Sequence, residues 1–333
     1  MSLKTYLRLH EKEQHTLSSY NKIEIARQAN ELGFIRDTFE KTKRLTDILA
    51  FFDTDPVLSR YLALKGGTAI NLTIFSLPRL SVDIDLDFSE NLPLSEMMEV
   101  RESIRNTIGR YMTINDYSLS PHSKSYHTLD SDIYNYINAG GVKDFIKIEI
   151  NYSLRSHVLP TKTRSIETLG ILTPTSVLSL DPIEIYASKI TALLSRAAAR
   201  DLYDASNMVV SSLFNEEQSI TLRKCIVFYA AIGGEDRPIA FDFTAMDKLT
   251  FHDIRRRLIP MLRKKERFDL DNKRESVKEY LNNLLQLNGD EKAFIAAFSS
   301  GEYKPELVFA GDELERIKSH PMALWKMQNH KKQ

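Results

Sequence analysis

The sequence predicts an α+β protein, with a small mixed sheet flanked by helices in the N-terminal part and a mostly helical C-terminal part. Short segments in which apolar and polar residues alternate strictly occur before about residue 165. Beyond that point the apolar residues recur mostly at helical spacing. The chain has 333 residues, which is enough for two domains. We expect these domains at residues 1–165 and 166–333, joined through the stretch from 155 to 175 that Pro160, Gly170 and Pro174 punctuate.

Composition and charge limit the class of protein. Hydrophobic residues make up 42% and charged residues 27%, as in ordinary soluble globular proteins. Lys plus Arg equals Asp plus Glu, so the total charge gives no sign of a strongly basic nucleic-acid binder. Cys225 is the single cysteine, which excludes an intrachain disulfide and a cysteine-rich zinc site. No apolar run approaches the ~18 residues of a membrane span, so we expect a cytoplasmic protein without a membrane partner.

The N-terminal elements follow in order from the pattern. Residues 5–59 are expected to be helical, most clearly 23–49. Residues 61–67 form a short apolar strand that ends in two glycines, and 69–76 are expected to form a short helix. The remaining elements are expected as a strand at 81–88, a helix at 95–112, and strands at 125–138 and 144–152.

The helical part opens with a clear start signal. Asp181 is expected as the N-cap, Pro182 as the first helical residue and Glu184 as the acid three positions after the cap. From there to the C-terminus the periodicity is mostly helical.

The strand at 81–88 carries the first candidate site. Its apolar residues fall on one face, whereas Ser81, Asp83, Asp85 and Asp87 fall on the other. The Cβ atoms of Asp83 and Asp85 are expected about 6–7 Å apart, so their carboxylates repel unless a cation lies between them. Oxygen ligands of this kind suit Mg²⁺ or Mn²⁺ and a phosphoryl-transfer reaction. The alternative is a solvated face, although Asp is depleted in strands.

Two neighbouring features fit phosphate chemistry. Gly66, Gly67 and Thr68 follow an apolar strand, and such a turn lets backbone amides approach a phosphate. Glu149 lies on the polar face of the strand at 144–152, from which it would act as a general base on an acceptor hydroxyl. The plain alternative is a surface residue between Lys147 and Asn151.

A family resemblance rests on these motifs. The runs LKGGTAINL (residues 64–72) and RLSVDIDLD (79–87), with the segments 184–189 and 200–204 and the tail from 303 to 325, resemble the AbiEii/AbiGii family. These nucleotidyltransferase toxins belong to bacterial type IV toxin–antitoxin and abortive-infection systems, within the polymerase-β-like superfamily. The chain departs from the superfamily pattern at Thr68, where Ser is usual, and at the third acid, which is Glu.

The resemblance implies a nucleotidyltransferase-like N-terminal domain and a helical C-terminal domain. It implies a nucleoside triphosphate substrate with Mg²⁺, a tRNA or other RNA acceptor, or GTP binding, and an antitoxin encoded nearby. The residues expected to be catalytic are Asp83, Asp85, Glu149, Lys189 and Asp204, with Asp83 and Asp85 as metal ligands. The residues expected to bind the nucleotide are Gly66, Gly67, Thr68, Arg79, Ser81, Lys189, Arg196 and Arg200.

The helix that begins at Pro182 supplies the expected phosphate-binding cations. If it continues unbroken, Lys189, Arg196 and Arg200 lie within about 20° of one line, where lysine and arginine suit phosphates. Asp204 would lie about 60° from that line and Asp201 about 120°, which favours Asp204 as their partner. The alternative is a solvated helix with a pair such as Arg200 and Asp204.

Two other functions and one basic segment stay open. A glycosyltransferase also uses Asp-x-Asp, to hold a metal-bound nucleotide sugar, and a non-catalytic nucleotide- or RNA-binding toxin would keep the site without the chemistry. The residues 255–257, 263–265 and 267 form a basic block that either contacts RNA phosphates or is the charged face of a surface helix.

Overall fold

The computed structural model describes residues 20–166, 174–234 and 240–330. The part of the expected N-terminal helix at residues 5–19, and Gly170 of the expected join, lie outside the described residues. In the described parts, no helix is long and apolar enough to cross a membrane.

Strands occur in the described chain only up to Ser179, whereas helices occur along its whole length. The strands are β1 (Leu62–Lys65), β2 (Asp83–Phe88), β3 (Ser118–Leu119), β4 (Lys124–Ser125), β5 (Leu129–Ile137), β6 (Lys143–Asn151), β7 (Lys162–Ile166) and β8 (Thr175–Ser179). The helices of the N-terminal part are α2 (Lys22–Leu32), α3 (Arg36–Thr54), α4 (Leu58–Tyr61), α5 (Gly66–Ala69), the π-helix η1 (Ile70–Ile74) and α6 (Leu94–Ile114). The later helices are α7 (Pro182–Ser195), α8 (Ala199–Val210), α9 (Glu216–Gly233), α10 (Thr244–Asp247), α11 (Phe251–Arg257), η2 (Ile259–Met261), α12 (Leu270–Leu284), α13 (Gly289–Ser299), η3 (Pro305–Leu307), α14 (Gly311–Ile317) and α15 (Pro321–His330).

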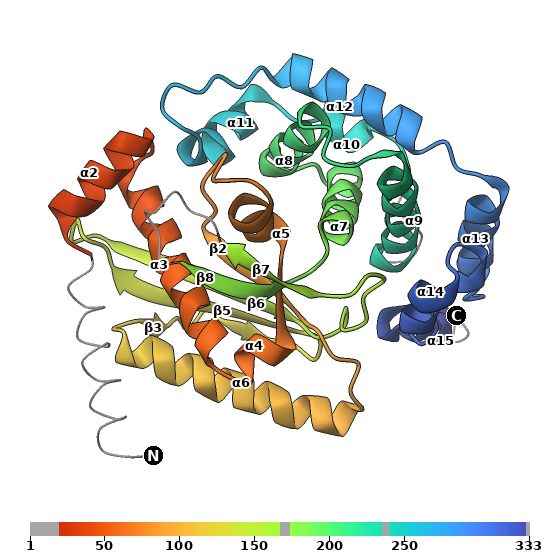
Figure 1. Ribbon diagram of the computed structural model, residues 1–333, viewed down its shortest axis with the longest axis horizontal. Helices are drawn as coiled ribbons and strands as arrows, with labels where there is room; N and C mark the ends of the chain where they lie inside the picture. The colour runs from red at the N-terminus through yellow and green to blue at the C-terminus, as the bar shows by residue number, and fades with distance from the viewer. Residues whose placement is uncertain (1–19, 167–173, 235–239, 331–333) are drawn as a thin grey trace.

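One mixed sheet organises the described residues. Its order is β3-β5-β6-β2-β1-β8-β7, with β4 paired to β5. The central strand β2 runs antiparallel to β1 and parallel to β6. The apolar face of β2 and β6 includes the buried residues Ile84, Leu86 and Ile148 and is covered by α3 and α6. The opposite face carries the aspartates of β2, and α5, α7 and α8 lie on that side (Figure 1).

The predicted α+β architecture is confirmed. The alternating segments at 81–88 and 144–152 are β2 and β6, and the expected helix at 95–112 is α6. The structure adds β7 and β8, which lie within or beyond the expected join. Because β8 pairs with β1, the sheet extends past residue 166. The division into domains at 165 and 166 stays a prediction.

Helix α7 begins with the expected cap, but the acid three positions after the cap has a different role from the one expected. The Asp181 side chain accepts the Ile183 amide, and Pro182 is the first helical residue. Glu184 does not reach back to the cap: its two carboxylate oxygens accept the amides of Val158 and Leu159.

The expectation of one helix from Pro182 through Asp204 is wrong. Helix α7 ends at Ser195 and α8 begins at Ala199. Ala197 between them has a φ of 43°, in the left-handed region that interrupts a helix. No Gly or Pro marks this break in the sequence. The tertiary contact between the two helices accounts for it, because Lys189 of α7 pairs with Asp201 and Asp204 of α8 only when the chain turns back.

Candidate functional site

The site is built around two aspartates on one face of β2. Asp83 and Asp85 are both partly exposed, and strand alternation directs their side chains to the same side. Burial and the negative charge of Asp83 raise the pKa of Asp85. Both effects disfavour the charged carboxylate, and a cation beside the two acids would favour it.

The structure brings Glu149 beside this pair. Strand β6 runs parallel to β2, and the register places Glu149 opposite Asp85 and Lys147 opposite Asp83. The Lys147 Nζ lies 2.9 Å from Glu149 Oε2, and both side chains are about one-third exposed. The three acids therefore share one face of two adjacent strands, as the alternation in the sequence predicted.

The Gly-Gly turn packs directly against the carboxylates. Gly66 has a φ of +67°, and a Cβ there would lie 2.7 Å from Asp85 Oδ2. A Cβ on Gly67 would lie 2.6 Å from Arg79 Nη2. Both positions therefore need glycine, one for its backbone conformation and both for close approach. The two residues begin α5, whose first-turn amides have no acceptor within the helix.

Thr68 and Ser81 lie beneath the carboxylates rather than on the surface. The Thr68 hydroxyl donates to the carbonyl of Asp83, and Thr68 Oγ1 lies 2.7 Å from Ser81 Oγ. Both residues are buried. Their hydroxyls connect α5 to the start of β2 and hold the first metal-ligand candidate in place.

Arg79 and Asp204 form a buried ion pair across 125 residues of sequence. Arg79 donates through Nε and Nη2 to the two carboxylate oxygens of Asp204, at 2.8 and 2.7 Å, and through Nη1 to Leu80 O. The side chains are 1% and 0% exposed. Arg79 was expected to contact the nucleotide, but its guanidinium donates to Asp204 and to the carbonyl of Leu80 instead.

Lys189 extends the network toward the site. Its Nζ lies 2.9 Å from Asp201 Oδ1 and 3.2 Å from Asp204 Oδ2. Burial alone would lower the pKa of Lys189, but the two carboxylates raise it, so the ammonium stays charged. Burial alone would raise the pKa of Asp204, but Arg79 and then Lys189 lower it. The helical geometry favoured Asp204 alone, and the turn after α7 brings in Asp201 as well.

The two arginines near the α7–α8 turn differ in position. Arg200 Nη1 lies 3.5 Å from Asp83 Oδ2, and its side chain is 36% exposed. Arg196 follows the last residue of α7 and is exposed, with no ion pair among the described residues. The structure therefore brings Arg200, and not Arg196, into contact with the carboxylate pair.

The sequence did not assign a contact to Asp87, the third aspartate of the strand. Its side chain is 3% exposed, and Oδ1 accepts from Lys65 Nζ of β1 at 2.5 Å. This neutralises Asp87 within the sheet and leaves Asp83 and Asp85 as the acids of β2 that face solvent.

The donor set fits a magnesium ion bound together with a nucleotide. Among the described residues, no group of three or more His, Cys, Asp or Glu side chains is placed to hold a metal by itself. Mg²⁺ is commonly bound by one or two carboxylates, with water and substrate phosphates completing the octahedron. Asp83 and Asp85 would supply those two carboxylates if the site holds such an ion.

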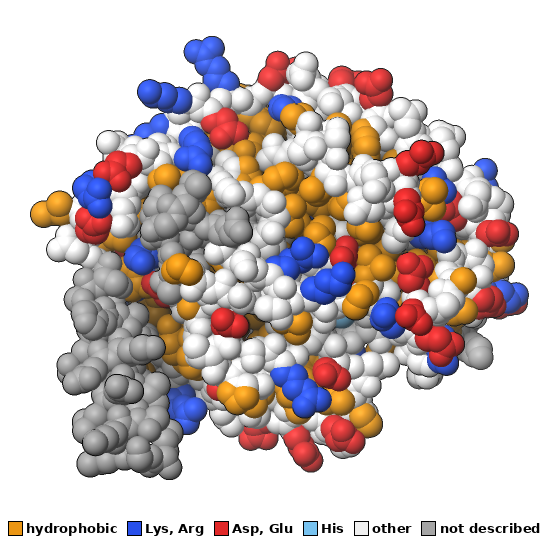
Figure 2. Space-filling view, in the orientation of Figure 1, with side chains coloured by type: hydrophobic (Ala, Val, Ile, Leu, Met, Phe, Trp, Pro, Cys, Tyr) orange, Lys and Arg blue, Asp and Glu red, His pale blue; other side chains and the backbone are white. Residues whose placement is uncertain are grey.

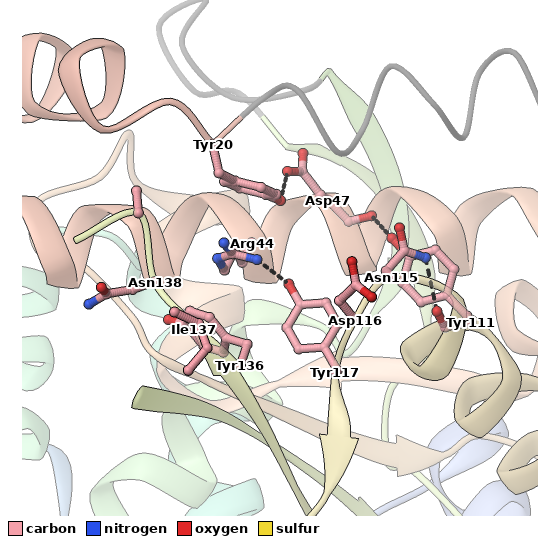
Figure 3. A pocket seen from close by; sticks show the side chains of 11 residues that line it. Tyr20, Arg44, Asp47, Tyr111, Asn115, Asp116, Tyr117, Tyr136, Ile137 and Asn138 are labelled. Atoms are coloured by element: carbon pink, nitrogen blue, oxygen red, sulfur yellow. Dashed lines mark hydrogen bonds between the residues drawn. The ribbon is translucent and has the colours of Figure 1, made fainter. Parts of the chain in front are cut away.

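A separate cavity lies on the other face of the sheet. It has a volume of about 370 Å³ and is bounded by α3, the end of α6 and β5 (Figure 3). The guanidinium of Arg44 lies 3.8 Å from the ring of Tyr20 and 4.3 Å from that of Tyr136, and donates to the Tyr117 hydroxyl. Tyr136 shares its face of the sheet with the apolar residues, so this cavity is separated from the carboxylates by the sheet.

The sequence and the fold have counterparts among known proteins. The sequence model of the AbiEii nucleotidyltransferase toxins of type IV toxin–antitoxin systems matches residues 49–304. No curated protein sequence matches the chain. Among solved structures, the nucleotidyltransferase toxin MenT4 of Mycobacterium tuberculosis superposes with a TM-score of 0.62 at 15% identity, covering 91% of this chain and 98% of MenT4. A protein from H. pylori assigned as a nucleotidyltransferase gives a TM-score of 0.46 at 17% identity, covering 76% of this chain and 96% of its own.

Proposed function

The chain belongs to the AbiEii nucleotidyltransferase toxin family of type IV toxin–antitoxin systems, and from this we propose a specific reaction. It transfers a nucleoside monophosphate from a nucleoside triphosphate to a hydroxyl at the end of an RNA, such as a tRNA, and it depends on Mg²⁺ or Mn²⁺. An antitoxin encoded nearby and a cytoplasmic location are part of the same proposal.

The proposal rests above all on the register of β2 and β6. Asp83 and Asp85 would hold the metal, which supplies positive charge to the triphosphate. Glu149, which is the register partner of Asp85, would take the proton from the acceptor hydroxyl. The acceptor oxygen then forms a bond to the α-phosphorus, the bond from that phosphorus to the bridging oxygen breaks, and pyrophosphate leaves.

The remaining residues divide into contact and positioning roles. The amides of Gly66 and Gly67, with Arg200, are assigned to the phosphates. Lys189 carries three donors, of which two are directed to Asp201 and Asp204, so one remains for a phosphate. Arg79, Asp204, Thr68 and Ser81 are assigned to positioning, since their polar groups are buried and bonded to one another or to the backbone.

Transfer of label to RNA tests the proposal. We expect the wild-type protein with Mg²⁺ to add label from an α-labelled triphosphate to total tRNA, each triphosphate being supplied in turn. Asp83→Asn should reduce this rate by about a thousandfold or more, because it removes several kcal/mol of metal-assisted stabilisation. Glu99→Gln, at a surface position of α6, is the control, and thermal unfolding checks that both variants fold.

Two results would contradict the proposal. Undiminished transfer by Asp83→Asn would remove the metal-ligand assignment. Growth arrest that persists in cells expressing Asp83→Asn would favour the non-catalytic toxin, because toxicity would then be independent of the carboxylates.

A further inference from the structure

An exposed group of cations lies on and after α11. It consists of Arg255, Arg256 and Arg257 in the last turn of α11, and of Lys264, Lys265 and Arg267 in the chain that leads to α12; these six residues are called the basic platform. All six are exposed, and none forms an ion pair with another described residue. Figure 2 shows Lys and Arg side chains projecting at the upper left, where α11 and this chain segment lie in Figure 1.

The density of cations distinguishes the platform in a chain of zero net charge, because six exposed cations without an ion pair to another described residue lie between residues 255 and 267. Other exposed cations do pair with acids, as Arg27 does with Glu24 and Glu31. Arg263 belongs to the same run of sequence but has a structural role, since it donates to the carbonyls of Leu32 and Leu77. The platform therefore concentrates positive charge, which Asp253 beside Arg257 and Glu266 between Lys265 and Arg267 offset only in part.

The segment that carries the platform packs against the chain that leads into the catalytic strand. The amide of Leu80 donates to Met261 O at 2.9 Å. The Tyr203 hydroxyl lies 3.0 Å from Pro78 O and 2.8 Å from Glu266 Oε1. Residues 78–80 lead directly into β2, on which Asp83 is the first residue.

Helix α11, which carries three of the platform residues, packs against α8, the helix that carries Arg200. Ile254 and Leu258 form a buried cluster with Ala199 and Tyr203 of α8. Arg200, next to Ala199, reaches Asp83. The segments that carry the platform are thus attached to the chain that leads into β2 and to the helix that carries Arg200.

An exposed aromatic ring adjoins the cations. Phe251 begins α11 and is 60% exposed, and it lies one helical turn before Arg255, so the two side chains share a face of the helix. An exposed aromatic ring beside cations can serve as a stacking surface for an unpaired base. A group of cations beside one exposed aromatic ring suits a nucleic-acid strand better than an acidic protein, which offers no bases.

We propose that the basic platform binds the phosphodiester backbone of the RNA acceptor, with Phe251 stacked on an unpaired base, and directs the end of that RNA to Asp83 and Asp85. This inference rests on the proposed function, since it assumes that the acceptor is an RNA. It adds a binding surface outside the catalytic face, made by residues that touch neither the metal nor the triphosphate.

A salt titration of RNA binding provides the test. The probe is a labelled RNA hairpin with four unpaired nucleotides at its 3′ end, and the test variant combines Arg255→Ala, Arg256→Ala and Lys265→Ala. The control variant combines Arg110→Ala, Lys124→Ala and Lys292→Ala, which removes three exposed cations from other surfaces. We expect the test variant to bind the hairpin at least about tenfold more weakly at low salt. The slope of log affinity against log salt concentration is negative. Its magnitude should be smaller by about 2 in the test variant, because three phosphate contacts are lost and each contributes about 0.7.

Further measurements separate the platform from the catalytic proposal. Binding of a labelled triphosphate should be unchanged in the test variant. Phe251→Ala should weaken binding of the hairpin about fivefold or more and leave a blunt duplex unaffected. If the wild-type protein binds RNA through the platform but transfers no nucleotide, the platform stands and the catalytic proposal fails.

Two outcomes would overturn the platform. The first is equal RNA affinity and salt slope in the test and control variants, whether or not transfer persists. The second is that only binding of an acidic polypeptide, with polyglutamate as the probe, is lost in the test variant, which would assign the surface to an acidic protein.

Discussion

At the scale of single residues, Arg79 and Asp204 explain why Gly67 is a glycine. The guanidinium reaches Asp204 by passing so close to the backbone that a Cβ on Gly67 would lie 2.6 Å from Nη2. A buried ion pair contributes little net stability, because desolvation offsets the attraction. The pair instead fixes positions, because it joins the chain before β2 to α8. Asp204 is also one of the two carboxylates that contact Lys189.

Replacing one charge of this network should destabilise the protein. Asp204→Asn keeps the shape but leaves the guanidinium of Arg79 without a bidentate acceptor, so we expect a loss of about 3–5 kcal/mol in the free energy of unfolding. Urea denaturation measures it. Glu31→Gln is the control, because it alters an exposed pair with Arg27 and should change the free energy by about 0.5 kcal/mol or less. If Asp204→Asn lowered the free energy of unfolding as little as Glu31→Gln, the buried guanidinium of Arg79 would not depend on the carboxylate of Asp204.

At the scale of elements, local pattern predicted the strands that carry the acids. Strands β2 and β6 alternate cleanly because each has one face in the core and one in the site. The same reasoning missed β7 and β8, which are five residues each and carry little alternation. They pair with each other, and β8 joins the rest of the sheet through β1, more than a hundred residues away at the contact of Leu64 with Ser179. Such partners are not visible in a local window.

The α7–α8 turn was missed for a related reason. The residues around Ala197 have high helix propensity, and local preference favours a continuous helix. Tertiary pairing between the two helices overrides that preference. The candidate acids Asp83, Asp85 and Glu149 were therefore predictable, whereas the pairings of Arg79, and the share of Asp201 in holding Lys189, required the fold.

The turn between β1 and α5 offers a matched pair of glycine substitutions. Gly66→Ala places a Cβ at positive φ and 2.7 Å from Asp85 Oδ2, so we expect a loss of at least about 1–2 kcal/mol in the free energy of unfolding. It should also slow nucleotide transfer, because Asp85 has to move. Gly109→Ala, within α6, meets no atom within 4 Å and should stabilise the protein by about 0.5–1 kcal/mol. Urea denaturation of both variants measures the contrast, and a neutral Gly66→Ala would contradict the close approach.

At the scale of the whole molecule, a buried polar cluster joins the sheet to the helical part. Glu184 of α7 accepts the amides of Val158 and Leu159, which follow β6, and the hydroxyl of Tyr229 from α9. His157 Nδ1 lies 3.7 Å from Glu184 Oε1, which is an ion-pair distance rather than a hydrogen bond. The cluster thus connects the strand that carries Glu149 to the helix that carries Lys189.

This cluster predicts a pH dependence of stability. Burial lowers the pKa of His157, but the Glu184 carboxylate outweighs it and raises the pKa above its ordinary value of 6.5. The pKa of Glu184 is lowered from 4.5, because His157 and the hydrogen bonds outweigh burial. Other charged and titratable groups that act on the pair include Asp87, Lys65, Tyr229, His320 and Cys225. Burial and then His157 lower the pKa of His320 to about 3, so it stays neutral throughout.

The sign of the effect follows from these two directions. The contribution of His157 is complete below its unfolded pKa and is lost as the pH rises through its higher folded pKa. The contribution of Glu184 is present above its unfolded pKa and is lost as the pH falls through its lower folded pKa. We therefore expect the pair to stabilise the protein most between about pH 4.5 and 6.5 and progressively less above that window.

Urea denaturation from pH 5.5 to pH 9 tests this with His157→Gln. The variant should be less stable than the wild type at pH 5.5, and the difference should shrink as His157 of the wild type loses its proton. His122→Gln, at an exposed position, should follow the wild type at every pH. A constant difference between His157→Gln and the wild type would mean that the histidine acts through packing alone. A shrinking difference would mean that the charge of His157 helps to hold the sheet, and with it Glu149, against the helix of Lys189.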